Sequence, residues 1–184
     1  MADSSSRQRA VVTGGARGIG YAIAEALVAR GDVVTMFDRD PAVVAAAETL
    51  GAVATVIDLT DSEGTSEAVR AAADARGGLE LLVNNAGIFR STPLLEITAE
   101  EWDEMFAVNV RSMVTTMQAA APAMSRGGAI VNLASMGGKA GEPGQAHYAA
   151  SKAAVISLTR VAAMELGPAN ITVNCLCPGY VLTE

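Results

Sequence analysis

The fold is decided by the stretch Ala10-Val-Val-Thr13-Gly-Gly-Ala-Arg-Gly-Ile-Gly20, in which a short apolar run meets a cluster of glycines. The apolar run is typical of a buried strand, and the residues from about Gly18 to Arg30 have helical character. Glycines permit a sharp turn and a close approach of the backbone to a ligand, while a helix N-terminus presents free amide donors and a positive dipole end. The stretch therefore predicts an anion site where a strand turns into a helix.

Five further apolar runs follow, separated by segments of helical period. They cover residues 33–37, 53–57, 79–83, 129–133 and 171–175. Continuous apolar strands that alternate with helices indicate a parallel sheet buried on both faces, with right-handed crossovers. We therefore expect a doubly wound, Rossmann-type α/β fold. The length of 184 residues fits a single domain, here residues 10–184, after a flexible tail of residues 1–9.

Several helix boundaries can be predicted from local chemistry. Thr60 with Glu63, and Thr98 with Glu101, have the spacing of capping boxes that begin helices. Pro41 suits a first helical turn, and Gly167-Pro168 should end a long helix.

Composition excludes several classes of function. The formal net charge of −7 disfavours nucleic acid and anionic membrane surfaces as partners. No apolar run reaches membrane-spanning length, and the polar N-terminal residues lack the apolar centre of a signal peptide, so we expect a cytoplasmic protein. Cys175 and Cys177 are interpreted as small apolar residues near the sheet. With one histidine and two cysteines, no metal site is predicted.

The glycine turn is consistent with a dinucleotide, although it does not prove one. Its spacing, Gly14, Gly18 and Gly20, is not the common G-x-G-x-x-G, and the cluster could be no more than a tight turn. Asp38 follows the second apolar run, at the place where a dinucleotide fold holds the carboxylate that accepts the adenosine ribose hydroxyls. The alternative for Asp38 is an ordinary acid at the end of a strand.

The same region bears on cofactor choice. A carboxylate at Asp38 would repel the additional phosphate of NADP, so NAD is favoured, although Arg17 and Arg39 could attract that phosphate. Asp58, after the third run, either contacts the adenine or forms a turn.

A possible reaction centre comes from three residues in the second half of the chain. Tyr148 and Lys152 stand four apart, so a phenol and an ammonium can share one helix face. A fixed cation stabilises a phenolate, which would let Tyr148 act as general acid/base near neutrality. Ser135 lies just beyond the fifth strand, at the sheet edge where such folds build their sites, and could hydrogen-bond a substrate oxygen.

Two asparagine motifs remain ambiguous at this level. Asn109 is a poor helix former inside a long predicted helix, and its amide either bridges a water to Lys152 or repairs a local helix distortion. Asn84-Asn-Ala-Gly87 is either a turn or backbone that lines a cofactor cleft.

Together these residues resemble the short-chain dehydrogenase/reductase family over nearly the whole chain. The motifs that carry the resemblance are Thr13-Gly-x-x-x-Gly18-x-Gly20, Asn84-Asn-Ala-Gly87, Asn109, Ser135, Tyr148-x-x-x-Lys152 and Pro178-Gly179. The resemblance implies hydride transfer between a nicotinamide and a carbonyl or alcohol. It implies that Tyr148 is the acid/base, Lys152 binds the nicotinamide ribose and lowers the tyrosine pKa, Ser135 orients the substrate oxygen and Asn109 supports a proton-relay water.

The resemblance also implies a set of cofactor contacts. Asp38 would select NAD and Asp58 would contact adenine, while Ile19, Asn85, Gly87 and Thr183 would lie along the rest of the cofactor. Pairing through two long helices, about 99–125 and 146–166, would make a homodimer or homotetramer. Family members continue for several dozen residues beyond Glu184, forming a substrate lid and a last strand, so we expect both to be missing here.

Three functional readings follow. The first is an active dehydrogenase. Its substrate could be a polyol, a sugar, a hydroxy acid, a steroid or an oxoacyl compound, and the sequence does not choose among them. The second is a non-catalytic NAD-binding sensor or assembly subunit. The third, a serine hydrolase using Ser135 and His147, is disfavoured because Leu133-Ala-Ser-Met-Gly137 lacks the first glycine of a nucleophile elbow.

Overall fold

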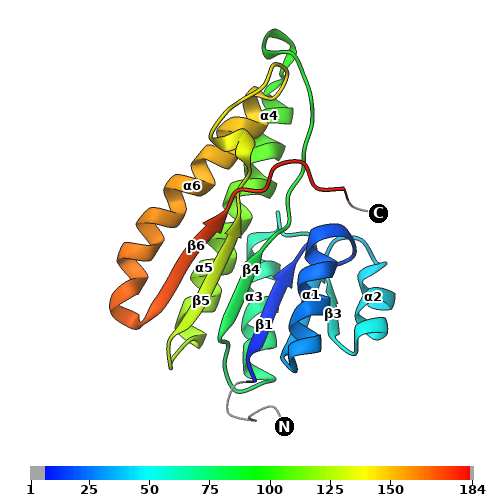
Figure 1. Cartoon of the computed structure of the whole chain (residues 1–184), viewed down its shortest axis with the longest axis vertical. Coiled ribbons are helices and arrows are strands. Elements are labelled where there is room, and N and C mark those ends of the chain that lie inside the picture. The colour runs from blue at the N-terminus through cyan, green and yellow to red at the C-terminus, as the bar shows by residue number, and fades with distance from the viewer. Residues whose placement is uncertain (1–6, 183–184) are drawn as a thin grey trace.

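The structure, a computed structural model, describes residues 7–182 and contains one six-stranded parallel sheet (Figure 1). Its strands are β1 (Arg9–Thr13), β2 (Val33–Asp38), β3 (Val53–Val56), β4 (Leu81–Asn84), β5 (Gly128–Leu133) and β6 (Ile171–Leu176). They lie in the order β3-β2-β1-β4-β5-β6. The chain thus winds outward in one direction from β1 and then in the other from β4, which confirms the doubly wound prediction.

The helices that connect the strands lie in the segments for which the sequence predicted helical structure. They are α1 (Gly18–Arg30), α2 (Val43–Leu50), α3 (Ser62–Asp74), α4 (Ala99–Phe106), α5 (Ser112–Ala120) and α6 (Ala146–Leu166), with short turns η2 (Leu94–Glu96), η3 (Ala107–Arg111), η4 (Ala121–Ala123), η5 (Met136–Gly138) and η6 (Gly167–Ala169). The predicted capping box of Thr98 and Glu101 begins α4. The helix α6 ends where Gly167-Pro168 was expected to end it.

Two apolar cores lie on opposite faces of the sheet. On one face, Val12 and Met36 of the strands pack with Ala24 of α1 and Val43 of α2. On the other face, a larger cluster joins strand residues such as Leu82 and Ile130 to α3, α5 and α6. Strands that are apolar on both sides have no polar face to expose, so they are buried between two helical layers.

Three starts of elements predicted from sequence need correction. The strand β1 begins at Arg9, and the Gln8 amide donates to Asp32 Oδ1 at 2.9 Å, so the structured chain starts before residue 10. The N-cap of α3 is Asp61, which accepts from the Gly64 amide, rather than Thr60. The helix α2 begins at Val43, two residues after Pro41.

The long helix expected over residues 99–125 is divided. A π-helical turn, η3, separates α4 from α5, and η4 ends the segment at Ala123. Asn109 lies in that π turn, which agrees with the helix distortion that was one of its two interpretations.

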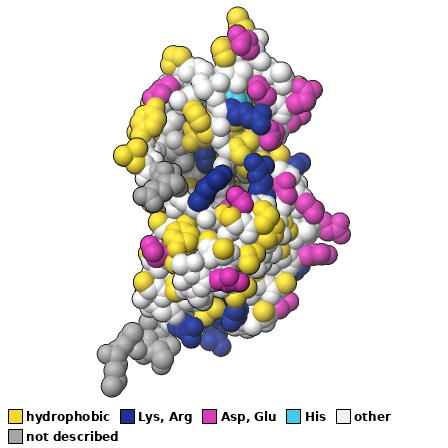
Figure 2. All heavy atoms as spheres, turned by 90° about the vertical axis from the view of Figure 1, so that its right-hand side faces the viewer, with side chains coloured by type: hydrophobic (Ala, Val, Ile, Leu, Met, Phe, Trp, Pro, Cys, Tyr) yellow, Lys and Arg dark blue, Asp and Glu magenta, His cyan; other side chains and the backbone are white. Residues whose placement is uncertain are grey.

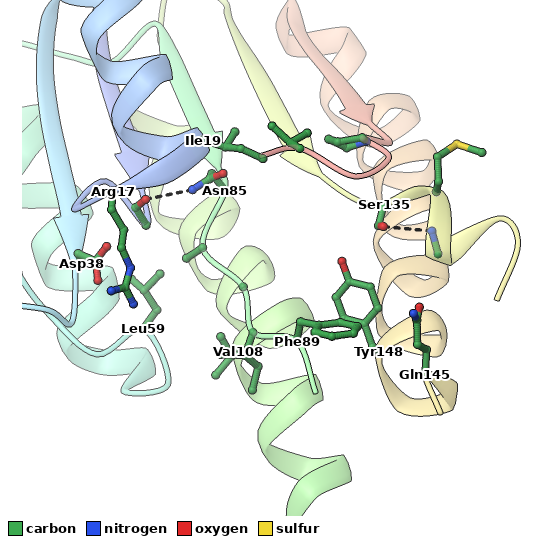
Figure 3. Close-up of a pocket in the computed structure, with 18 of the residues that line it drawn as sticks. Arg17, Ile19, Asp38, Leu59, Asn85, Phe89, Val108, Ser135, Gln145 and Tyr148 are labelled. Atoms are coloured by element: carbon green, nitrogen blue, oxygen red, sulfur yellow. Dashed lines mark hydrogen bonds between the residues drawn. The ribbon is translucent and has the colours of Figure 1, made fainter. Parts of the chain in front are cut away.

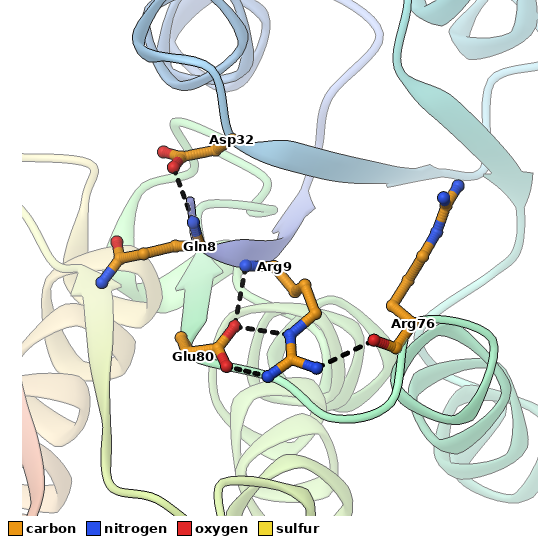
Figure 4. Close-up of polar contacts among 5 residues, drawn as sticks. All are labelled: Gln8, Arg9, Asp32, Arg76 and Glu80. Carbon is orange, nitrogen blue, oxygen red and sulfur yellow. Dashed lines mark hydrogen bonds and ion pairs between the residues drawn. The ribbon is translucent and has the colours of Figure 1, made fainter. Parts of the chain in front are cut away.

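Arg9 also makes a close ion pair at the end of the sheet opposite the glycine turn (Figure 4). The Glu80 carboxylate accepts from the Arg9 amide at 2.8 Å and from Arg9 Nε at 2.7 Å, and Arg9 Nη1 donates to the Arg76 carbonyl. The side-chain bond from Arg9 lowers the pKa of Glu80. This contact fixes the start of β1 to the segment that enters β4.

Two absences can be stated for the part of the chain that the structure describes. Over residues 7–182, no helix has both the length and the apolar character needed to cross a membrane. Within the same residues, no three potential ligands among His, Cys, Asp and Glu gather as they would around a metal ion.

Candidate active site

A cleft of about 800 Å³ lies at the carboxyl ends of the strands. It includes the ends of β1 and β4, the point where the strand order reverses and where open α/β sheets bind ligands. Arg17 and Asp38 lie at one end of this cleft and Ser135, Tyr148 and Gln145 at the other (Figure 3). On the face drawn in Figure 2, basic side chains gather at the hollowed middle of the molecule.

The glycine turn is built for close backbone approach. Gly14 and Gly18 have φ values of +68° and +59°, in the left-handed region that favours glycine. A Cβ at Gly20 would lie 2.0 Å from the Gly14 carbonyl oxygen, so any larger residue would displace the turn. Asn85, the residue after β4, supports the turn, because its Nδ2 donates to the carbonyls of Thr13 and Gly14 at 3.0 and 3.1 Å.

The same turn fits an anionic group. The N-cap residue of α1, Arg17, makes no side-chain capping bond, and the first turn of α1 contains no acidic residue. Neither a side-chain cap nor an acidic residue therefore occupies this helix start, as an anion site at the turn would require. Ile19 and Gly14 line the cleft directly, whereas Gly20 supports them from behind.

Asp38 lies at the same end of the cleft as Arg17, and two backbone amides hold its carboxylate in place. Its Oδ2 accepts from the Ala16 amide and its Oδ1 from the Asp40 amide, each at 3.0 Å. Each carboxylate oxygen keeps further acceptor capacity for a ligand hydroxyl. Arg17 and Arg39 line the same part of the cleft.

Asp58 also lines the cleft, yet its carboxylate already forms a turn. Its Oδ1 accepts from the amide and the hydroxyl of Thr60 at 2.9 and 2.8 Å, and these bonds lower the pKa of Asp58. The turn-forming interpretation of this residue is therefore realised, and the residue also lines the cleft.

The other end of the cleft brings Ser135, Tyr148 and Lys152 together. Ser135 follows β5, and its Oγ accepts from the Gly137 amide at 3.0 Å, while Tyr148 and Lys152 share the first turns of α6. A smaller recess is lined by all three residues together with Gly87 and Pro178. The Tyr148 ring packs edge-on against Phe89, with ring centroids 4.9 Å apart, and points toward Ser135 (Figure 3).

Lys152 is a buried cation whose direction is fixed. Its side chain is buried, its Nζ donates to the Leu133 carbonyl at 2.8 Å, and the same atom lies 5.9 Å from the centre of the Tyr148 ring. Burial lowers the pKa of Lys152 to about 8, so the ammonium form still prevails at pH 7. A lysine ammonium has three N–H donors. One binds the Leu133 carbonyl, so two remain for other groups.

Asn109 links three segments around this end rather than contacting Lys152 directly. Its Oδ1 accepts from the Ile88 amide at 2.8 Å, and its Nδ2 donates to the Ile88 carbonyl and to Ser151 Oγ at 3.0 and 3.1 Å. Ser151 in turn donates to the Tyr148 carbonyl at 2.7 Å. Gly87 lies beside both side chains, because a Cβ there would be 3.2 Å from Asn109 Oδ1 and 3.3 Å from Lys152 Nζ.

The geometry contradicts a serine–histidine pair. His147 is fully buried, and within residues 7–182 neither of its ring nitrogens has a hydrogen-bond partner. Ser135 Oγ is instead engaged by Gly137. The nucleophile–base contact that a hydrolase requires is therefore not formed by these two residues.

Most residues expected at the site border the cleft, including Pro178, Gly179, Asn85 and Gly87. Thr183 lies outside the described residues. Sequence reasoning missed the lining residues Phe89, Glu142, Gln145 and Tyr180. A signal existed for Gln145, which stands three residues before Tyr148 and therefore on the same side of the helix start.

Comparison with known proteins agrees with this geometry. The family described as short chain dehydrogenase matches residues 8–184. The chain belongs to this family. Family members are enzymes that act on CH–OH or carbonyl groups, so the resemblance noted from the motifs is confirmed.

Individual relatives cover most of the chain. Sorbitol dehydrogenase of Cereibacter sphaeroides is 44% identical, over 94% of this chain and 70% of its own length. A 3-oxoacyl-(acyl-carrier-protein) reductase of Staphylococcus aureus is 38% identical, over 95% and 75%. The structure of a short chain dehydrogenase from Mycobacterium smegmatis has a TM-score of 0.92 at 31% identity, covering 96% of this chain and 78% of that one.

Proposed function

We propose that this chain is an NAD-dependent oxidoreductase that acts on a secondary alcohol or the corresponding carbonyl, with Tyr148 as general acid/base. The observation that carries the proposal is that one cleft joins the glycine turn and Asp38 to Ser135 and Tyr148, and a smaller recess brings Lys152 to the same two residues. A bound nicotinamide cofactor would supply or accept the hydride at the second of these ends. The protein must then position the substrate and move a proton.

Each residue at the reaction end has a distinct role. The Ser135 hydroxyl donates a hydrogen bond to the substrate oxygen, and Tyr148 Oη exchanges a proton with that same oxygen. The ammonium of Lys152 lies 5.9 Å from the centre of the Tyr148 ring, and its remaining donors suit the ribose beside the nicotinamide. Asn109 holds Ile88 and Ser151 in place and is a positioning residue for α6.

Asp38 supports NAD as the cofactor. Its carboxylate is fixed by two backbone amides at the edge of the cleft, where it can accept ribose hydroxyls and repels an additional phosphate. Arg17 and Arg39 act in the opposite direction, because guanidinium groups bind phosphate well. We further propose a cytoplasmic location and a homodimer or homotetramer, both of which rest on the family.

The test is a titration of the chain with NADH and with NADPH, following nicotinamide fluorescence and the thermal midpoint. Tighter binding of NADH would support the role of Asp38, and tighter binding of NADPH would show that the two arginines prevail. If neither nucleotide bound, the proposal would be abandoned.

A further inference from the structure

A small hydrogen-bonded group borders the reaction end and has no role in the chemistry proposed above. It consists of Glu142 and Gln145, which precede α6, and Tyr180, which follows β6. Gln145 Nε2 donates to Glu142 Oε2 at 3.0 Å, and the Tyr180 hydroxyl donates to the same oxygen at 2.8 Å. All three residues line the cleft.

Gln145 is close to the reacting groups. A Cβ built on Gly137 would lie 3.3 Å from Tyr148 Cε1, 3.4 Å from Ser135 Oγ and 3.5 Å from Gln145 Oε1. One point is therefore within van der Waals reach of the acid/base ring, the serine oxygen and the Gln145 amide. In Figure 3 Gln145 lies next to Tyr148, on the side away from Asp38. A substrate held by Ser135 would therefore have the Gln145 amide within reach.

Glu142 sets the charge of this region. The other charged residues that line the main cleft within the described chain, Arg17, Asp38, Arg39 and Asp58, belong to its opposite end. The cation of the reaction end, Lys152, lies in the inner recess and is tied to Leu133. The part of the cleft that Glu142, Gln145 and Tyr180 line is thus negatively charged, and its side-chain oxygens can accept hydrogen bonds.

The Tyr180 contact shows what Glu142 can hold. Tyr180 is 90% exposed, yet its hydroxyl donates to the Glu142 carboxylate. A carboxylate accepts hydroxyl donors strongly, and it repels another anion placed at the same distance. A hydroxyl of a bound substrate would find the same acceptor.

We propose that Glu142 and Gln145 form a hydroxyl-recognition subsite, which selects neutral polyhydroxylated substrates over anionic ones. This inference rests on the proposed oxidoreductase function and assigns its substrate class. A sugar alcohol carries several hydroxyls beyond the reacting carbon and can bond both side chains. A hydroxy acid of the same length would bring a carboxylate against Glu142.

The experiment compares three substrates of similar length: a hexitol, the corresponding aldonate and hexan-2-ol. In the unmodified chain the hexitol should have the highest kcat/KM. Glu142→Gln should raise KM for the hexitol about tenfold, because the acceptor of the substrate hydroxyl loses its charge, and leave kcat within about twofold. The same variant should improve kcat/KM for the aldonate.

Tyr180→Phe is the matched control, since it removes the partner of Glu142 but keeps the carboxylate. This variant should retain the preference for the hexitol. An equal loss in both variants would mean that Glu142 only holds the Tyr180 segment, and it would overturn the inference. A preference of the unmodified chain for the aldonate or for hexan-2-ol would overturn it as well.

Failure of the subsite can be told apart from failure of the whole proposal. The hexitol is also titrated into the complex of the chain with NADH, with nicotinamide fluorescence as the readout, which requires no turnover. Weaker hexitol binding in Glu142→Gln at unchanged NADH affinity supports the subsite. NADH binding with hexitol affinity equal in both chains rejects the subsite alone, whereas absence of NADH binding rejects the oxidoreductase.

Discussion

The ammonium of Lys152 donates a 2.8 Å hydrogen bond to the main-chain carbonyl of Leu133, which ties α6 to the carboxyl end of β5. This bond fixes a buried cation in the recess that also holds Ser135 and Tyr148. The position of the charge is therefore set by the backbone of the sheet and not by another side chain.

The pKa of about 8 for Lys152 predicts an alkaline limit for activity. As pH rises through about 8, the free enzyme loses the ammonium, so kcat/KM should fall above that pH. Lys152→Met should remove this limit together with most of the activity. A pH profile of kcat/KM measures the effect, and an unmodified chain whose activity stays constant to pH 10 would contradict it.

The same shift predicts a stability effect with a definite sign. An unfolded lysine titrates near ~10.4, so between about 8 and 10 the unfolded chain binds more protons than the folded one. Stability therefore rises with pH over that range, and below it burial of the charge is unfavourable. Lys152→Met should have a higher thermal midpoint at pH 7 than the unmodified chain, with the difference shrinking toward pH 10.

Tyr148→Phe should separate binding from chemistry. The substitution removes one oxygen but keeps the ring that packs 4.9 Å from Phe89, so folding and NADH affinity should be unchanged. Turnover should fall by about 10² or more, since a positioned acid/base contributes about 10²–10⁴. Near-normal turnover in steady-state assays would eliminate Tyr148 as the proton-transfer group.

Gly20→Ala should damage the cofactor end. The new Cβ would lie 2.0 Å from the Gly14 oxygen and 2.5 Å from Asn85 Nδ2, so the turn must move. NADH affinity should fall by at least about tenfold, and the free energy of unfolding should fall by about 1–3 kcal/mol. Gly167→Ala is the control, because a Cβ there has no neighbour within 4 Å among the described residues and its φ of −53° is helical.

Glu80 should contribute to stability at neutral pH and lose that contribution in acid. Its pKa is lowered chiefly by the Arg9 side-chain bond, so the contribution is complete above the unfolded value of about 4.3 and disappears as pH falls through the lower folded value. Glu80→Gln should reduce the free energy of unfolding by about 1–2 kcal/mol at pH 7. Denaturant titrations at pH 7 and pH 3 test this, with Glu67→Gln on the exposed side of α3 as control.

Local chemistry explains which features the sequence could predict. The capping box of Thr98 and Glu101 depends on residues three apart, and it formed as expected. The box of Thr60 and Glu63 did not form, because Asp61 offers an equally good cap one position later. Apolar runs located the strands well, although β4 begins at Leu81 rather than residue 79.

Contacts between distant segments could not be predicted in the same way. Glu142 and Tyr180 are 38 positions apart, and nothing in the spacing of either indicates the other. For Asn109, sequence properties indicated an unusual helix position. Only the packing of α4, η3 and α6 around Ile88 and Ser151 shows which groups its amide satisfies.

The order of the strands divides the cleft by chain position. Arg17, Asp38 and Asp58 come from the first 60 residues, Ser135 and Tyr148 come from the segment after β5, and the stretch from Asn85 to Phe89 lies between the two groups. Under the proposed function, the residues that set cofactor preference and those that set substrate preference therefore come from different parts of the chain. Substitutions near the first two strands are then expected to change which nucleotide binds, whereas substitutions after β5 are expected to change which alcohol reacts.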